Sequence, residues 1–289
     1  MKTACIIFGF QYQGKYRIPG ILIDMFRAYQ FATKADMDVM VITDIHEDQD
    51  NKDLIRGFHK KNCDARIFSF IQSLKESGAY LIWESLKDIQ NAMFYFLHGK
   101  RRLFFYYSGH SVQTKFLFPD LQLVPTTEVI RLDPMEPKSQ IFFLLDCCNS
   151  SYLDLPFLMA MDYSVSRYRT TAITKGGVYH IHTQDYQFTG HDVLCISSSM
   201  ADENASATWV GSTFTQLFFQ ALEDEETRNI HAILKKVQHV MKGKQSCRAY
   251  ASFPYIHALF PWLFNPEVGR IRHSDHGIVI CLNEKKIKA

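Results

Sequence analysis

Two apolar runs in the chain end in residues that can carry out nucleophilic chemistry. Residues 141–151 read I-F-F-L-L-D-C-C-N-S-S, and residues 103–111 read L-F-F-Y-Y-S-G-H-S. Short apolar runs that are rich in aromatic residues and end in polar ones are typical of strands buried on both faces. If the two strands are parallel neighbours, a cysteine and a histidine meet at one edge of the sheet, where imidazole can activate a thiol.

The alternation of side chains along a strand separates the two adjacent cysteines. Asp146 and Cys148 fall on one face, and Cys147 falls on the other. Ser108 and His110 share a face if extended geometry persists to the histidine. We therefore interpret Cys148 as the candidate nucleophile and Cys147 as structural. On the pattern alone, a buried structural thiol is an equally good reading of Cys148, because free cysteine is among the most buried residues.

Composition limits the kind of protein that this chain can be. With 289 residues, 47% hydrophobic and 21% charged, it suits one sizeable globular domain. A formal net charge of +2 gives no sign of a general nucleic-acid or membrane-surface binder. No apolar run approaches the roughly 20 residues that span a bilayer, and the N-terminus reads as a strand rather than a signal peptide. Seven irregularly placed cysteines favour a reducing compartment, so we expect a cytoplasmic location.

The elements that position the two motifs are predicted from apolar periodicity. Strands are expected in residues 4–10, 36–43, 65–70, 103–111, 141–151 and 193–197, with a hairpin over 269–282. Helices are expected from Pro19, over 54–61, between Ser85 and Gly99, and over 211–222 and 227–241. Residues 115–139 are expected to be irregular. Alternating strands and helices indicate a parallel α/β sheet with right-handed crossovers.

At these motifs the sequence resembles the caspase-fold cysteine peptidases, and most of all the metacaspases. The family places its catalytic histidine in Y-S-G-H-G, and residues 107–111 read Y-S-G-H-S. It places its nucleophile as the second cysteine of D-C-C-H-S-G, and residues 146–151 read D-C-C-N-S-S. Residues 20–24, 198–207 and 211–215 resemble three further family segments in the same order, so the resemblance covers roughly residues 4–264.

The resemblance implies an α/β fold: a caspase-like three-layer sandwich with a central, mostly parallel sheet flanked by helices. One peptidase domain would span residues 1–289. It would have a large-subunit-like part (1–163), an exposed linker (164–187) and a small-subunit-like part (188–289). The linker is polar and carries Arg167, Arg169 and Lys175, so the chain could cleave itself there.

The resemblance also implies a thiol peptidase that needs no cofactor. His110 would be the acid/base and Cys148 the nucleophile. The backbone N–H groups of Ser111 and Cys148 would bind the oxyanion. Substrates would be proteins or peptides cut after Arg or Lys, and we expect a monomer that binds neither nucleic acid nor membrane.

Two acids and one hydroxyl residue correspond to residues that line the metacaspase pocket for a basic P1 side chain. These are Asp24, Asp146 and Ser108. Carboxylates bind cationic side chains and can hold arginine bidentately. The plainer readings are a charge near a helix N-terminus for Asp24 and polar strand ends for Ser108 and Asp146.

Departures from the family motifs keep a second function open. Ser111, Asn149 and Ser151 replace Gly, His and Gly of the family pattern. The alternative is therefore a catalytically weak, caspase-like decoy or adaptor domain. The acids between the two motifs are scattered rather than clustered, so no calcium site is expected. His180, His182 and His191 suggest a metal site only weakly, and a solvated loop is the better interpretation.

Overall fold

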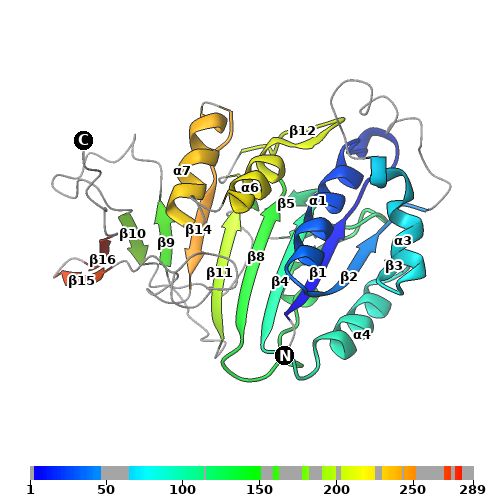
Figure 1. The fold of residues 1–289 in the computed structure, drawn as a ribbon, viewed down its shortest axis with the longest axis horizontal. Helices are drawn as coiled ribbons and strands as arrows, with labels where there is room; N and C mark the ends of the chain where they lie inside the picture. The colour runs from blue at the N-terminus through cyan, green and yellow to red at the C-terminus, as the bar shows by residue number, and fades with distance from the viewer. Residues whose placement is uncertain are drawn as a thin grey trace.

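A computed structural model describes residues 3–46, 65–113, 115–150, 159–162, 178–181, 191–199, 203–224, 230–242, 244–251, 270–274 and 277–281. Its main sheet contains β1 (Ala4–Gly9), β2 (Asp38–Thr43), β3 (Tyr80–Ile82), β4 (Arg102–Ser108), β8 (Gln140–Asp146), β9 (Met159–Asp162), β10 (Val178–Ile181), β11 (Asp192–Ser197) and β14 (Arg248–Ala251). The spatial order is β10-β9-β14-β11-β8-β4-β1-β2-β3 (Figure 1). The six strands from β11 to β3 are mutually parallel, and β14, β9 and β10 extend the sheet in antiparallel fashion.

Smaller elements complete the described chain. The helices are α1 (Ile21–Lys34), α3 (Phe70–Glu76), α4 (Leu86–Leu97), α5 (Thr126–Val129), α6 (Thr213–Glu223) and α7 (Ile230–Met241), with 3-10 turns at Gly14–Tyr16 and Ala65–Ser69. Short strands are β5 (Ser111–Val112), β6 (Lys115–Leu117), β7 (Leu123–Pro125), β12 (Ala207–Thr208), β13 (Gly211–Ser212), β15 (Arg270–Ser274) and β16 (Gly277–Cys281). Within these described ranges, no helix is long and apolar enough to cross a membrane.

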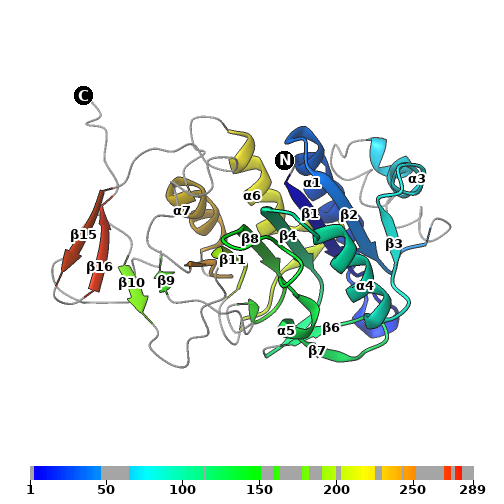
Figure 2. The same cartoon turned by 90° about the horizontal axis from the view of Figure 1, so that it is seen from below.

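Helices lie on both faces of the sheet. Helices α1, α3, α6 and α7 pack on one face, while α4, α5 and the β5–β7 sheet cover the other (Figure 2). Successive side chains of β8 point to opposite faces of the sheet and so enter both hydrophobic cores. Phe142 and Leu144 face the first layer of helices, and Phe143 and Leu145 face the second. The predicted three-layer α/β sandwich with a mostly parallel central sheet is therefore confirmed.

The register of the central strands aligns their carboxyl ends. In the β4–β8 pair, Ser108 lies opposite Asp146, and in the β1–β4 pair Gly9 lies opposite Ser108. The histidine and cysteine motifs follow these residues directly in the chain. The prediction that both motifs end parallel neighbours, at one edge of the sheet, is confirmed.

Helix α4 begins and ends where the sequence signals predict. The side chain of Ser85 caps it by accepting a hydrogen bond from the backbone N–H of Asp88 at 3.3 Å. Ile89, Met93 and Leu97 form its buried stripe. The helix ends at Leu97, two residues before Gly99, whose φ of +68° suits a residue without Cβ.

Two sequence predictions about local structure are wrong. Residues 65–70, predicted as a strand, form a 3-10 turn that leads into α3. The buried residues of this segment recur every three or four positions, as in a helix, and not at every second position, as in a strand. They are Ile67, Phe70, Ile71 and Leu74. Residues 115–139, predicted as irregular, contain β6, β7 and α5. Elements of three or four residues are too short to show a period.

Other expectations have mixed outcomes. The hairpin predicted near the end of the chain is present as β15 and β16. The helix expected over 54–61 lies outside the described residues. Within the predicted linker, Val178–Ile181 pair with β9 as strand β10. The rest of residues 164–187 lie outside the described residues, so their role as a linker stays a prediction.

Candidate active site

A cavity of about 200 Å³ lies at the carboxyl edge of β4 and β8. We call it the site cavity. The residues that line it are Arg17, Ile18, Pro19, Ile21, Ser108, Gly109, His110, Asp146, Cys148, Ala205, Ser206, Ala207 and Ser212. Four residues singled out from the sequence therefore meet there, and these are Ser108, His110, Asp146 and Cys148. Asp24 and Ser111, also singled out, are not part of the lining.

The two adjacent cysteines have different surroundings. Cys147 is completely buried in the layer beneath α4, where burial raises the pKa of its thiol well above the usual value. Cys148 is half-buried and lines the site cavity. Its Sγ accepts a hydrogen bond from the backbone N–H of Ala205 at 3.3 Å. The alternation predicted from the sequence thus separates an inert thiol from an accessible one.

The His110 side chain is oriented through one ring nitrogen. Nε2 lies 2.7 Å from the backbone oxygen of Tyr16. A carbonyl oxygen can only accept, so Nε2 carries the proton and Nδ1 of the neutral ring is the basic nitrogen. The backbone of His110 is also held, because its N–H donates to Tyr12 Oη at 2.9 Å and its carbonyl accepts from Tyr107 Oη at 2.7 Å.

Tyr12 connects the loop after β1 to the histidine. Its hydroxyl donates to the Leu117 carbonyl at 2.6 Å, and its ring centroid lies 4.8 Å from that of His110. Burial raises the pKa of Tyr12, so the phenol stays protonated. Asp44 fixes the loop by accepting from the N–H groups of Gln11 and Tyr12, both at 2.7 Å. Sequence reasoning missed Tyr12 and Asp44, because a polar loop carries no periodic signal.

Replacing Tyr12 with phenylalanine tests this support. The partly buried N–H of His110 loses its acceptor, so the free energy of unfolding should fall by about 1–3 kcal/mol in urea denaturation. Tyr95→Phe is the control, since Tyr95 is 79% exposed on α4. Equal midpoints for wild type and Tyr12→Phe would show that the hydroxyl does not support the histidine.

The turn after Cys148 is built by residues that differ from the family motif. Asn149 has φ +52°, a left-handed conformation that asparagine tolerates, and its N–H donates to the Glu203 carbonyl at 3.0 Å. Ser150 and Ser199 are linked by reciprocal hydrogen bonds, with Ser150 N–H donating to Ser199 Oγ at 3.1 Å and Ser199 N–H to Ser150 Oγ at 3.0 Å. These contacts fasten the turns after β8 and β11 together. Ser151 lies outside the described residues.

Ser111 also departs from the family glycine. It is buried in β5, and its hydroxyl donates to the backbone carbonyl of Cys148. The substituted side chain therefore ties the histidine motif to the cysteine motif.

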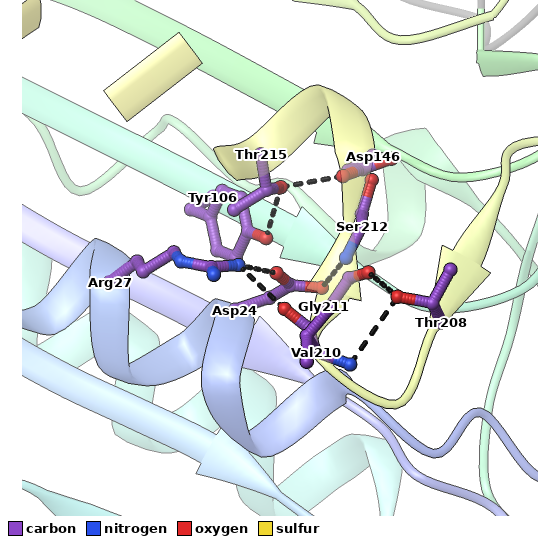
Figure 3. Close-up of polar contacts among 9 residues, drawn as sticks. All are labelled: Asp24, Arg27, Tyr106, Asp146, Thr208, Val210, Gly211, Ser212 and Thr215. Atoms are coloured by element: carbon purple, nitrogen blue, oxygen red, sulfur yellow. Dashed lines mark hydrogen bonds and ion pairs between the residues drawn. The ribbon is translucent and has the colours of Figure 1, made fainter. Parts of the chain in front are cut away.

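The two acids of the predicted pocket differ in exposure to the site cavity. Asp146 lines the cavity and accepts a hydrogen bond from Thr215 Oγ1 at 2.5 Å, and Thr215 Oγ1 also lies 2.8 Å from Tyr106 Oη (Figure 3). Burial raises the pKa of Asp146, while hydroxyls around it, including those of Ser212 and Thr215, oppose the rise.

Asp24 lies behind the wall of the site cavity. Its carboxylate is fully buried and accepts from Arg27 Nη1 at 3.1 Å and from the N–H of Ser212 at 2.7 Å (Figure 3). Burial raises the pKa of Asp24, the nearby charge of Asp146 adds to this, and Arg27 opposes it. Of the three predicted pocket residues, Ser108 and Asp146 thus line the site cavity, whereas Asp24 lies behind Ser212, outside the lining.

No metal centre is found in the described part of the chain. There, no three His, Cys, Asp or Glu side chains are grouped closely enough to hold an ion. His191 is half-buried, and burial lowers its pKa. His182 lies outside the described residues, and of His180 only the backbone in β10 is described.

The Cys148 thiol and the His110 imidazole thus line one cavity at the carboxyl edge of the parallel strands. The family model for the caspase domain matches residues 4–261, so the chain belongs to the caspase domain family. It is a caspase-like cysteine peptidase domain.

Two solved structures that are similar to this chain share little sequence with it. Protein GSU0716 from Geobacter sulfurreducens is similar at 11% identity and a TM-score of 0.51, covering 92% of this chain and 97% of that one. Caspase-1 from Spodoptera frugiperda is similar at 12% identity and a TM-score of 0.49, covering 86% of each chain. A search of curated protein sequences found no match.

Proposed function

We propose that this caspase-like domain is an active endopeptidase of metacaspase type that cleaves proteins and peptides after lysine or arginine. The observation that carries the proposal is that His110, Cys148 and Asp146 line one cavity. The thiol and imidazole supply the chemistry, and the acid supplies the preference for a cation. The enzyme works as a cytoplasmic monomer and needs no cofactor.

The reaction proceeds through a thioester. Cys148 Sγ attacks the scissile carbonyl carbon as the thiol proton passes to the imidazole of His110. The imidazolium then gives this proton to the leaving amine as the C–N bond breaks. In the second half, His110 removes a proton from water, the hydroxide oxygen attacks the thioester, and the proton returns to Cys148 as the acid product leaves.

Two features of the backbone support these steps. The Tyr16 carbonyl accepts from Nε2, so it fixes the tautomer with a basic Nδ1 and stabilises the imidazolium that forms. The N–H groups of Ser111 and Cys148 bind the oxyanion, and such donors typically contribute about 2.7–4 kcal/mol each. A serine in place of glycine retains this N–H.

The preference for a basic P1 residue comes from Asp146. It lines the site cavity with Ser108, and a carboxylate there attracts Lys or Arg and repels Asp. Asp24 adds negative charge from behind the wall, but Arg27 balances it.

The pH dependence of P1 selectivity tests the role of Asp146. Because burial raises the pKa of Asp146, the carboxyl is neutral at low pH and gains its charge only above that raised value. The ratio of kcat/KM for a lysine substrate to that for its norleucine analogue should rise with pH, by up to about tenfold per unit, and then level off. The ionisation of His110 affects both substrates equally, so it cancels in the ratio. Asp146→Asn has no carboxyl to ionise, so its ratio should not rise with pH.

Labelling with a peptidyl-lysine acyloxymethyl ketone tests the function itself. We expect one adduct on Cys148 in the wild-type protein and none after Cys148→Ala. The alternative, a weak decoy or adaptor domain, predicts no adduct and no cleavage of peptides with Lys, Arg or Asp at P1. Cleavage after Asp alone would contradict the basic preference but not the peptidase activity.

A further inference from the structure

The side chain of Arg27 pairs with Asp24, the acid that was expected to bind a substrate cation. Its Nη1 donates both to Asp24 Oδ1 at 3.1 Å and to the carbonyl of Val210 at 3.0 Å (Figure 3). Arg27 lies one helical turn after Asp24 on α1, and Val210 lies in the turn between β12 and β13. One guanidinium therefore neutralises the acid and fastens the turn over it.

The turn leaves no room beside this ion pair. Gly211 has φ +92°, and a Cβ there would lie 2.2 Å from Asp24 Oδ1 and 2.7 Å from Arg27 Nη1. Only glycine suits both the backbone conformation and the contact. Thr208 closes the turn by donating from its hydroxyl to the Gly211 carbonyl at 3.0 Å. Asp24 is thus enclosed by its own helix and by the turn.

Ser212 separates Asp24 from the site cavity. Its N–H donates to Asp24, and the residue itself lines the cavity. Its hydroxyl is buried beside Asp146 (Figure 3). The cavity therefore presents one acid with a hydroxyl beside it, where two acids were expected.

We propose that Arg27 is an internal ligand of Asp24 that leaves the site cavity with a single acid, Asp146, and so makes it select lysine over arginine at P1. This inference rests on the proposed function and defines its substrate class more narrowly. A lysine ammonium is a compact charge with three donors, which one carboxylate and neighbouring hydroxyls can accept. A guanidinium is best held bidentately by a carboxylate, but Asp146 Oδ2 already accepts from Thr215.

Removing the guanidinium should free the second acid. In Arg27→Met the turn loses its link to Val210, and Asp24 loses its cation. The released turn can then move Ser212 aside, so that an arginine at P1 reaches Asp24 from the site cavity. The preference should move from lysine toward arginine, and this change should need Asp24.

Paired peptides that differ only in Lys or Arg at P1 give the measurement. We expect wild type to favour lysine about fivefold in kcat/KM, and Arg27→Met to shift the ratio toward arginine by about tenfold. The double variant Asp24→Asn/Arg27→Met should return the wild-type ratio, because no second acid is left to free. Lys34→Met is the matched control, since Lys34 is an exposed cation on the same helix, and its ratio should equal that of wild type.

The single variant Asp24→Asn provides a second test if Arg27→Met does not fold. It should leave the Lys/Arg ratio and the Lys/norleucine ratio within about threefold of wild type, whereas Asp146→Asn should lower the second ratio at least tenfold. An arginine preference in wild type, or an unchanged ratio in folded Arg27→Met, overturns the inference alone. Absence of cleavage after both basic residues overturns the proposed function, and the inference with it.

Discussion

Replacing Cys148 with alanine should abolish cleavage of basic-P1 peptides, whereas replacing Cys147 should leave most of the activity. Loss of a covalent nucleophile lowers kcat by about 1,000-fold or more, because the chemistry has no other path. Cys147 is fully buried in the layer beneath α4, away from the site cavity, and its thiol stays protonated. Its loss removes one sulfur atom from the core and should cost about 1–2 kcal/mol of stability.

Initial rates and melting temperatures, measured together, separate the two effects. Cys147→Ala should melt at a lower temperature and retain kcat/KM within severalfold below that temperature. Cys148→Ala should melt close to wild type, because the side chain is only half-buried. An inactive Cys147 variant beside an active Cys148 variant would mean that the nucleophile is the other cysteine.

The face that each cysteine takes could be predicted from the sequence because β8 is buried on both sides. Apolar residues on both faces hold the strand in one register, since a slip by one residue would exchange the two cores. Phe142 and Leu144 pack under α1 and α6, and Phe143 and Leu145 under α4. Simple alternation then carries Cys147 into one core and leaves Cys148 at the cavity.

The charge balance of the pocket could not be predicted in the same way. Asp24 was recognised from its motif, and Arg27 lies only three residues further along the same helix. The hairpin residues that hold this pair, Ser212 at Asp24 and Val210 at Arg27, come nearly 190 residues later. Such long-range pairs leave no periodic trace in the sequence. The support of His110 by Tyr12 and Tyr16 escaped prediction for the same reason, because both lie in a polar loop.

Replacing Gly20 with alanine should give the largest loss of stability among single methyl additions near the site. A Cβ at Gly20 would lie 2.1 Å from the Thr208 carbonyl oxygen and 2.4 Å from the Gly211 nitrogen. Both are backbone atoms, so no side chain can rotate away. The start of α1 and the β12–β13 hairpin must separate by about 1 Å, and overpacking of this severity costs about 3 kcal/mol.

The same displacement should reach the site cavity, because Ala207 and Ser212 of the hairpin line it. A shift of that size can lower kcat/KM by about 100-fold without touching a reacting group. Gly78→Ala is the matched control: its φ is +70°, but a Cβ there meets nothing within 4 Å. It should cost only about 1–2 kcal/mol and leave kcat/KM unchanged. Equal activity of the two alanine variants would show that close packing of Gly20 against the hairpin does not shape the cavity.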